Sequence, residues 1–367
     1  MVTFQTQQIK KYAKTLQSSI GKEDHYSECF LLDFENNKIQ FKSDTDDETG
    51  QVYYGHLKVG FKGQHEKFWV DAVTFLHLCR SYDEIKVDNF VFEAVSTGEK
   101  FELKRVDSDE YDESDSYDFY DFTFETADKL SYNLISTLST AMEFTNPDYN
   151  FPNVYVDEGI VYAGDSIIYT ERKVDWELGS VQFSPVITKL LNGLMTANSE
   201  IRIGFDEDVV YLSADGEVEI IAGYIVSDNK IDYENENFRN VFMHNNIVKI
   251  EKSRIMNVLK FLEPFMRDSD NKISITLVDN KMIIKPEIAG YKAEKTISDV
   301  EYDESLEGKS FNMISEPVKK ALGSLHSNKV LIRISVDVFD DEGKELKLPV
   351  SFQTVDEKEL VVVPVAI

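Results

Sequence analysis

The chain has 367 residues, of which 42% are hydrophobic and 12% aromatic, so it is long enough for two or three domains and too apolar to be mostly disordered. No apolar run approaches the ~20 residues that a membrane-spanning helix needs, and the first residues lack the apolar core of a signal peptide, so we expect a cytoplasmic protein. A formal net charge of −28 argues against a nucleic-acid-binding protein of the usual, basic kind.

Short β-type segments alternate with a few amphipathic helices along the sequence. Runs of β-branched and aromatic residues predict strands at 28–34, 38–42, 90–94, 101–106, 201–205, 209–213, 218–222, 272–278, 281–285, 330–338 and 360–365. Apolar residues three and four positions apart predict helices at 8–22, 71–81, 126–142, 184–197, 249–267 and 316–329. Pro185 and Pro317 fit the first turns of two of these helices. The pattern predicts an α+β fold with antiparallel sheets.

The order of the predicted helices contains a repeat. The first, third and fifth helices start at 8, 126 and 249, and a second helix follows each of them after about the same interval. This periodicity predicts three similar domains at residues 1–122, 123–247 and 248–367. The stretch 107–121, with eight acidic residues and no basic one, fits a solvated connection between the first two domains.

Positive charge is concentrated in the predicted helices. The six helical segments together carry +10 over 90 residues, so the other 277 residues carry −38. On a helical wheel, Lys11 and Lys14 lie opposite the apolar side of the first helix, and Lys260 and Lys320 lie on the polar sides of the fifth and sixth. Charged faces are ordinary on solvated helices, but solvated faces of so acidic a protein should be acidic. A basic strip on an acidic body would attract a polyanion locally and discourage it elsewhere.

The sequence gives little sign of catalysis. It contains no GxxxxGK[ST], GxGxxG or HExxH motif, and its six histidines lack metal-ligand spacing. Cys29 and Cys79 lie in apolar settings, which predicts reduced thiols in the core. We therefore expect no enzyme activity, no cofactor and no bound metal.

At pattern level the whole chain resembles the bacterial-type DNA polymerase sliding clamp, the β subunit family. The segments that carry the resemblance are FWVDA at 68–72, YAGDS at 162–166, IDY at 231–233, SFN at 310–312 and LVVVPVAI at 360–367. The family pattern has a Thr in the second segment, a Pro where Ile231 stands, and Met and Arg in the tail, so this chain would be a divergent member, with a bacteriophage as one candidate source.

The resemblance implies three clamp domains, each with two helices and two small antiparallel sheets, and two subunits closed head to tail into a ring whose helices line the hole. Such a ring would encircle double-stranded DNA without reading its sequence and would tether a DNA polymerase after a clamp loader ATPase had opened it. The expected DNA-binding residues are Lys10, Lys11, Lys14, Arg80, Lys129, Lys189, Lys249, Lys260, Arg267, Lys319 and Lys320.

Two further sites follow from the resemblance by position. A pocket for partner peptides, between the second and third domains, would be lined by Ile167, Tyr169, Ile231, Tyr233, Val361, Val363 and Val365. The subunit interface of the homodimer would contain Phe101, Leu103, Phe265, Met266 and Ile273.

Two other classes of function stay open at this stage. One is an acidic DNA mimic or interaction scaffold that does not encircle DNA, which predicts acidic helix faces. The other is an uncharacterised α+β enzyme, which no motif supports.

Overall fold

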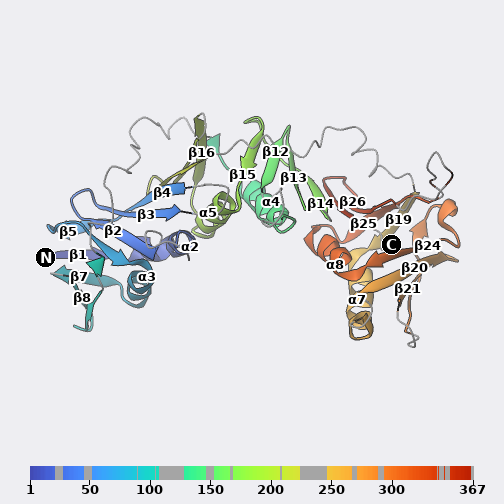
Figure 1. Ribbon diagram of the computed structural model, residues 1–367, viewed down its shortest axis with the longest axis horizontal. Coiled ribbons are helices and arrows are strands. Elements are labelled where there is room, and N and C mark those ends of the chain that lie inside the picture. Colours follow the sequence, from blue (N-terminus) through green and yellow to red (C-terminus); the bar gives the residue numbers. More distant parts are fainter. Residues whose placement is uncertain are drawn as a thin grey trace. The chain divides into compact units, whose positions relative to one another are not determined.

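The computed structural model describes residues 1–20, 28–44, 52–88, 90–103, 105–106, 128–145, 153–165, 168–206, 209–223, 246–266, 271–287, 293–336, 338, 343 and 348–364 (Figure 1). The chain divides into two compact units. The first comprises Met1–Ser139 and Gln182–Val226, and the second comprises Thr140–Val181 and Ser227–Ile367.

The first unit contains two antiparallel sheets. A five-stranded sheet has the order β5 (Phe61–Gly63), β1 (Val2–Gln5), β7 (Glu84–Asp88), β8 (Val91–Ala94) and β9 (Lys100–Glu102). A nine-stranded sheet has the order β10 (Arg105–Val106), β6 (Phe68–Asp71), β2 (Cys29–Asp33), β3 (Lys38–Asp44), β4 (Val52–Lys58), β18 (Val218–Gly223), β17 (Val209–Ala214), β16 (Ile201–Asp206) and β11 (Asp128–Lys129). Strand β4, from the first third of the chain, pairs antiparallel with β18, from the second.

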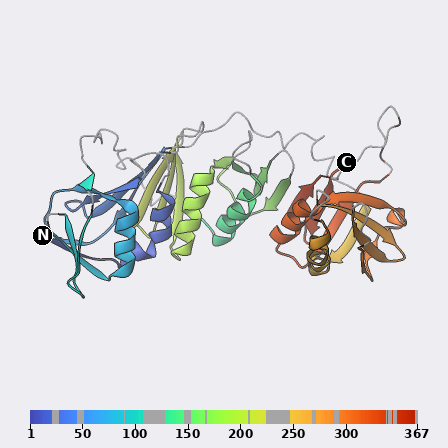
Figure 2. The same cartoon turned by 60° about the horizontal axis from the view of Figure 1, so that its bottom comes forward.

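The helices of this unit are α1 (Gln7–Lys11), α2 (Ala13–Ser18), α3 (Ala72–Ser81) and α5 (Pro185–Thr196), and α4 (Tyr132–Met142) crosses the division between the units. Helices α2 and α5 lie side by side (Figure 2). They come so close that a Cβ added at Gly193 of α5 would stand 2.9 Å from Oγ1 of Thr15 in α2. Glycine is therefore required at this helix contact because no larger residue fits without displacement.

The second unit repeats this architecture. Its nine-stranded sheet has the order β15 (Val181–Phe183), β12 (Val154–Asp157), β13 (Ile160–Gly164), β14 (Tyr169–Lys173), β27 (Glu359–Val363), β26 (Val350–Thr354), β25 (Lys329–Ile334), β19 (Asn246–Glu251) and β23 (Glu301–Tyr302), with β15 also crossing the division. A four-stranded sheet has the order β22 (Lys295–Ile297), β21 (Lys281–Pro286), β20 (Lys272–Val278) and β24 (Ser310–Ile314). Its helices are α7 (Lys252–Met266) and α8 (Ser315–Ser324), with a 3₁₀ turn at Glu304–Leu306.

One order of elements occurs three times along the described chain. Strands β1, β11 and β19 each precede a helix, which is α1 with α2, then α4, then α7. Strands β6, β15 and β24 each precede a second helix, α3, α5 or α8. The three-domain division at residues 122 and 247 stays a prediction, and its second boundary falls inside β19.

Local signals explain where the helices begin. Asp71 caps α3 by accepting a hydrogen bond from the Thr74 N–H at 2.7 Å, and Ser184 caps α5 in the same way ahead of Pro185. The side chains of β20 alternate between buried and half-buried, as the period-two pattern predicts. Both predicted core thiols, Cys29 and Cys79, are buried, and neither belongs to a disulfide in the described part of the chain.

Four predicted helices differ from the structure. The first is interrupted at Tyr12, whose ring is buried. The third starts at Tyr132, because Asp128 and Lys129 pair with β16, and the Ser131 hydroxyl accepts the Leu134 N–H. The fifth starts at Lys252, because residues up to Glu251 pair with β25. The sixth ends at Ser324 and not at 329, because Lys329 pairs with Glu251 as the first residue of β25. Lys129 and Lys249 therefore belong to strands and not to helices.

Candidate nucleic-acid interface and docking surfaces

Five of the predicted DNA-binding lysines are ion-paired with carboxylates of their own unit. Outside the α1 cluster described next, the pairs are Lys10 with Asp83 at 2.5 Å, Lys129 with Glu200 at 2.7 Å, Lys249 with Glu301 at 3.3 Å, and Lys319 with Glu316 at 2.9 Å and Glu263 at 3.5 Å. These partners come from other elements or from the preceding helical turn. Each of these ammonium groups is thus offset by an adjacent negative charge.

The fifth, Lys11, belongs to a polar cluster between α1 and the β17–β18 turn. Its ammonium donates to Asp215 at 2.8 Å and to Glu217 at 3.0 Å, and the Tyr12 hydroxyl lies against the same two carboxylates. Ser199 donates to the Tyr12 hydroxyl at 3.1 Å. Two carboxylates therefore share one lysine, which makes Lys11 a connection between α1 and the turn.

The protonation states of this cluster follow from its contacts. Burial alone would lower the pKa of Lys11, but the hydrogen bonds to Asp215 and Glu217 raise it above its ordinary value. Burial raises the pKa of Tyr12 to about 12, and the neighbouring Glu217 acts in the same direction. At neutral pH the cluster holds an ammonium, two carboxylates and a neutral phenol.

The remaining predicted DNA-binding residues have different surroundings. Lys14 on α2, Lys189 on α5 and Lys260 on α7 are exposed, and within the described part of the chain none of them forms an ion pair. Lys320 on α8 is half-buried with its ammonium 5.0 Å from the centre of the Phe144 ring. Arg80 donates to the Gln17 side chain at 2.8 Å and to the Ala13 carbonyl at 3.4 Å. Arg267 lies outside the described residues.

The predicted peptide pocket is only partly within the described chain. Ile167, Ile231, Tyr233 and Val365 lie outside it. Tyr169 stands opposite Val362 in the β14–β27 pairing and packs with Val362 in a cluster that includes Tyr155 and Tyr162. Since neighbouring residues of a strand face opposite sides of the sheet, Val361 and Val363 lie on the other face from Tyr169, where both are fully buried. The structure therefore brings Tyr169 to Val362 and Leu360, and not to the two valines.

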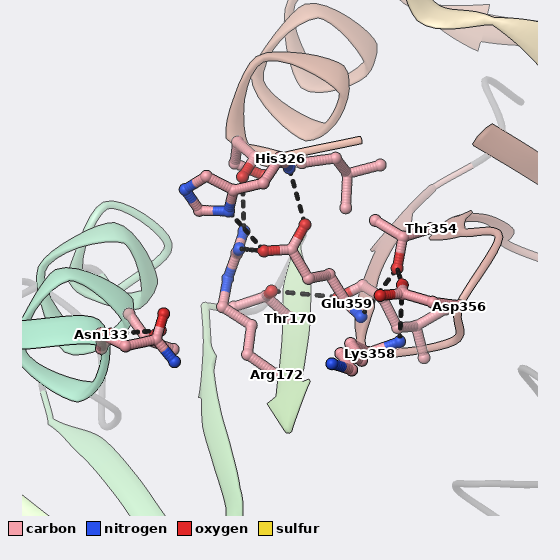
Figure 3. A network of polar contacts seen from close by, with 12 residues as sticks. Asn133, Thr170, Arg172, His326, Thr354, Asp356, Lys358 and Glu359 are labelled. Carbon is pink, nitrogen blue, oxygen red and sulfur yellow. Dashed lines mark hydrogen bonds and ion pairs between the residues drawn. The ribbon is translucent and has the colours of Figure 1, made fainter. Parts of the chain in front are cut away.

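A polar network around the buried Arg172, which the sequence analysis did not identify, lies where β14, β27 and α8 meet (Figure 3). Arg172 is 1% exposed and donates to Glu359 at 2.8 Å and to the Ser324 carbonyl at 3.1 Å. Glu359 also accepts the His326 backbone N–H at 2.7 Å and contacts its imidazole Nδ1 at 2.5 Å. Burial lowers the pKa of Arg172, and the adjacent Glu359 opposes that effect. The network connects strands that are far apart in the sequence.

The residues predicted for the subunit interface have mixed exposure. Phe101 is half-buried in the edge strand β9, where its ring lies 5.5 Å from that of Tyr82, and Leu103 is buried. Phe265 on α7 is 37% exposed. Met266 and Ile273 are fully buried in the core of the second unit and offer no exposed surface in this chain.

The structure adds a residue that the sequence analysis missed. Phe261 on α7 is 50% exposed, its ring lies 6.2 Å from that of Phe265, and the Lys295 ammonium of edge strand β22 lies 4.4 Å from its centre. Together, Phe261 and Phe265 form an apolar patch beside β22, which is an edge strand of the four-stranded sheet in the described part of the chain; we call it the α7 patch. Their position off the buried stripe of α7 was the signal in the sequence that could have identified Phe261.

The described residues contain no group of three or more His, Cys, Asp and Glu side chains placed to hold a metal ion. Within the same ranges, no helix combines the length and the apolar character that a membrane crossing requires.

Comparison with known proteins identifies the fold. No protein-family model and no curated protein matches the sequence. Among solved structures, the DNA polymerase III β subunit of Pseudomonas aeruginosa superposes with a TM-score of 0.77 at 14% identity, covering 100% of both chains. The β subunit of Thermotoga maritima gives 0.78 at 13% identity, covering 100% of this chain and 99% of that one. A putative β subunit of Eubacterium rectale gives 0.76 at 13%, with the same coverage. The chain thus has the mixed α+β fold of DNA polymerase III β sliding clamps over its full length, as the resemblance implied.

Proposed function

We propose that this chain is a DNA sliding clamp: a non-enzymatic protein, two copies of which close head to tail around double-stranded DNA and tether a DNA polymerase to it. The proposal is supported by the full-length likeness of the fold to sliding clamps and by the identity of the strands that form two of the sheet edges, β9 and β22. The second of these is the observation that carries the proposal.

In the repeated order of elements, β9, β18 and β27 are equivalent, and so are β4, β14 and β22. Strand β4 pairs with β18, and β14 pairs with β27, so each nine-stranded sheet joins two consecutive repeats. The remaining members of the two sets, β9 and β22, are both edge strands. A free sheet edge is a template for pairing with another chain. The third joint would therefore form between β22 of one copy and β9 of the next.

Equivalent positions on the first helix of each repeat support this joint. The buried residues align Ile9, Ala13 and Leu16 with Leu134, Leu138 and Ala141, and with Ile255, Leu259 and Leu262. Ser19 and Phe144 then correspond to Phe265. Ser19 is 1% exposed and Phe144 0%, whereas Phe265 is 37% exposed.

The same alignment relates Thr15, fully buried against α5, to Phe261, which is 50% exposed. The α7 patch thus occupies positions that are covered where the chain makes its own joint. In the proposed dimer, the patch would pack on α3 of the other copy, which is the counterpart of α5. This assigns the interface to β9, β22 and the α7 patch, and leaves Met266 and Ile273 as core residues.

The remaining features of the proposal are consistent with this geometry. Exposed helix lysines would hold the phosphate backbone without reading bases, which permits sliding. A clamp loader ATPase would open the ring, and partner peptides would bind near Tyr169. Such a protein would work in the cytoplasm, where the replicating DNA is.

The decisive test is topological. A linear duplex, through whose open end a ring can thread, is incubated with the protein and then blocked at both ends by streptavidin on terminal biotin. A ring is retained in about 1 M NaCl, where the Debye length is only about 3 Å, until a restriction enzyme cuts the duplex. Release by salt alone, from a duplex with blocked ends, would exclude encirclement, and an acidic DNA mimic would not bind the duplex at all.

A further inference from the structure

We infer that four lysines at equivalent positions of the repeats, Lys14, Lys189, Lys260 and Lys320, are the residues that contact the DNA phosphates. This inference rests on the proposed clamp function. It separates them from Lys10, Lys11, Lys129, Lys249 and Lys319, whose charges are held by carboxylates of the chain itself.

The second helices establish the equivalence of Lys189 and Lys320. Helix α5 buries Ile187, Leu190, Leu191 and Leu194, and the chain through α8 buries residues with the same spacing, which are Val318, Ala321, Leu322 and Leu325. Lys189 and Lys320 each stand two residues after the first member of their set. At 100° per residue, both project about 150° away from the buried stripe. The two lysines therefore leave their helices in the same direction relative to the core of their repeat.

The first helices give the same result for Lys14 and Lys260. Lys14 directly follows Ala13, and Lys260 directly follows Leu259, which are aligned members of the buried sets. Both lysines are exposed. In α3 the set with the same spacing is Ala72, Phe75, Leu76 and Cys79, so Thr74 fills the position of Lys189 and Lys320, and Ser139 follows Leu138 in α4. These two positions, each taken in three repeats, thus hold four lysines, a threonine and a serine, and no carboxylate, in a chain of formal net charge −28.

The ion pairs explain why the other lysines contribute little to DNA binding. An ammonium within 2.5–3.3 Å of a carboxylate forms a pair with no net charge, so the pair attracts a phosphate less strongly than an unpaired ammonium at the same distance does. To reach a phosphate it would have to leave its partner and expose that carboxylate to the DNA. An unpaired lysine can contact a phosphate without breaking an ion pair or exposing a carboxylate to the DNA. Each such contact releases a condensed counterion.

Repetition of one contact geometry also suits sliding. Phosphates recur along the duplex, so lysines placed at equivalent positions of a repeated fold can exchange one phosphate for the next. Two copies would present eight such lysines. None of them needs a base edge, so the surface would bind duplex DNA of any sequence.

The experiment compares two variants with the same change in formal charge. Lys14, Lys189, Lys260 and Lys320 are changed to Gln in one, and the ion-paired Lys10, Lys129, Lys249 and Lys319 in the other. Binding to a fluorescein-labelled 40-base-pair duplex is followed by anisotropy from low to physiological salt. The slope of log K against log[salt] falls by about 0.9 for each phosphate that the protein no longer neutralises, so the slope of the first variant should fall by up to about 3–4 per chain. Its affinity should drop at least tenfold, and that of the second by less than twofold.

Each outcome decides a separate question. Equal losses of affinity in the two variants, or a larger loss in the ion-paired set, would overturn the division while leaving the clamp proposal in place. Absence of binding by the unmodified protein would overturn the clamp proposal itself. Changing the same four residues to Arg keeps the charge and should retain the salt slope, and unchanged thermal unfolding of both Gln variants shows that their folds are intact. Disappearance of the salt slope in the Arg variant would also overturn the inference, because it would show that charge is not what these positions supply.

Discussion

The exposed α7 patch predicts how strongly two copies of the chain associate. Phenylalanine side chains bury roughly 150–250 Å² each. With exposed fractions of 50% and 37%, Phe261 and Phe265 have about 100 and 75 Å² left to cover. At about 25 cal/mol per Å², covering both contributes about 4 kcal/mol to each joint. Removal of both rings in the double variant Phe261→Ala, Phe265→Ala should therefore raise the dissociation constant of a joint by about a thousandfold.

Sedimentation equilibrium over nanomolar to micromolar concentrations measures this change. The unmodified chain should sediment near twice 42.2 kDa, and the double variant near 42.2 kDa. Val355→Ala is the matched control, since Val355 is 45% exposed and lies in the turn between β26 and β27, which is not part of the proposed interface. The reasoning is refuted if the double variant dimerises as tightly as the control. Thermal unfolding of the isolated double variant should fall to a lower temperature, because half or more of each ring is already buried within its own chain, and a cooperative transition shows that the variant is still folded.

Three further predictions concern the polar clusters and the helix contact. Because the pKa of Tyr12 is raised to about 12, the folded state keeps the phenol proton at a pH where the unfolded state, with a pKa near 10, has lost it. The stability that this proton contributes is therefore fully present below about pH 10 and is lost toward pH 12. Urea denaturation should show this decline, and it should be less steep in Tyr12→Phe. Gly193→Ala should lower the urea midpoint by forcing α2 and α5 apart, whereas Gly323→Ala, with open space around it, should raise stability by about 0.5–1 kcal/mol. Arg172→Met should cost about 3 kcal/mol by leaving a carboxylate without its buried partner, against less than about 1 kcal/mol for Arg333→Met near the surface.

Each of these has an outcome that contradicts it. Identical alkaline profiles for the unmodified chain and the Phe variant would show that Tyr12 does not titrate differently on folding. Equal effects of alanine at positions 193 and 323 on the urea midpoint would contradict the close approach of α2 and α5. Equal losses of stability in the two arginine variants would mean that burial of the Arg172 pair carries no special weight.

The sequence predicted those parts of the fold that have local causes. Helix α5 begins where Ser184 and Pro185 indicate, because a capping hydroxyl and a proline act on their own first turn. The sequence mispredicted the start of the helix near Lys249. The alternation of apolar residues continues from β19 into α7, and only the distant partner β25 decides that residues up to Glu251 extend as a strand.

The candidate site was harder to predict for the same reason. The basic character of Lys11 and Lys14 is equal in the sequence, but the β17–β18 turn, some 200 residues later, supplies carboxylates to one and not to the other. Strand β22 is three residues long and starts with a charged side chain, so no hydrophobic run marks it. Strand β22 enters the proposed interface because it is an edge strand, whereas its equivalents β4 and β14 each pair with a strand of the next repeat. Only the sheet order shows this difference.

The edge strands β9 and β22 belong to different repeats, so a contact between β9 of one copy and β22 of another joins two unlike surfaces. Unlike surfaces either close into a cycle or propagate as a filament, according to the rotation that each contact imposes. In a cycle of two copies there are two interfaces, and opening one of them leaves the copies joined by the other. Opening the ring to admit DNA would then cost the free energy of a single interface. Reclosure would be unimolecular, so its rate would not depend on protein concentration.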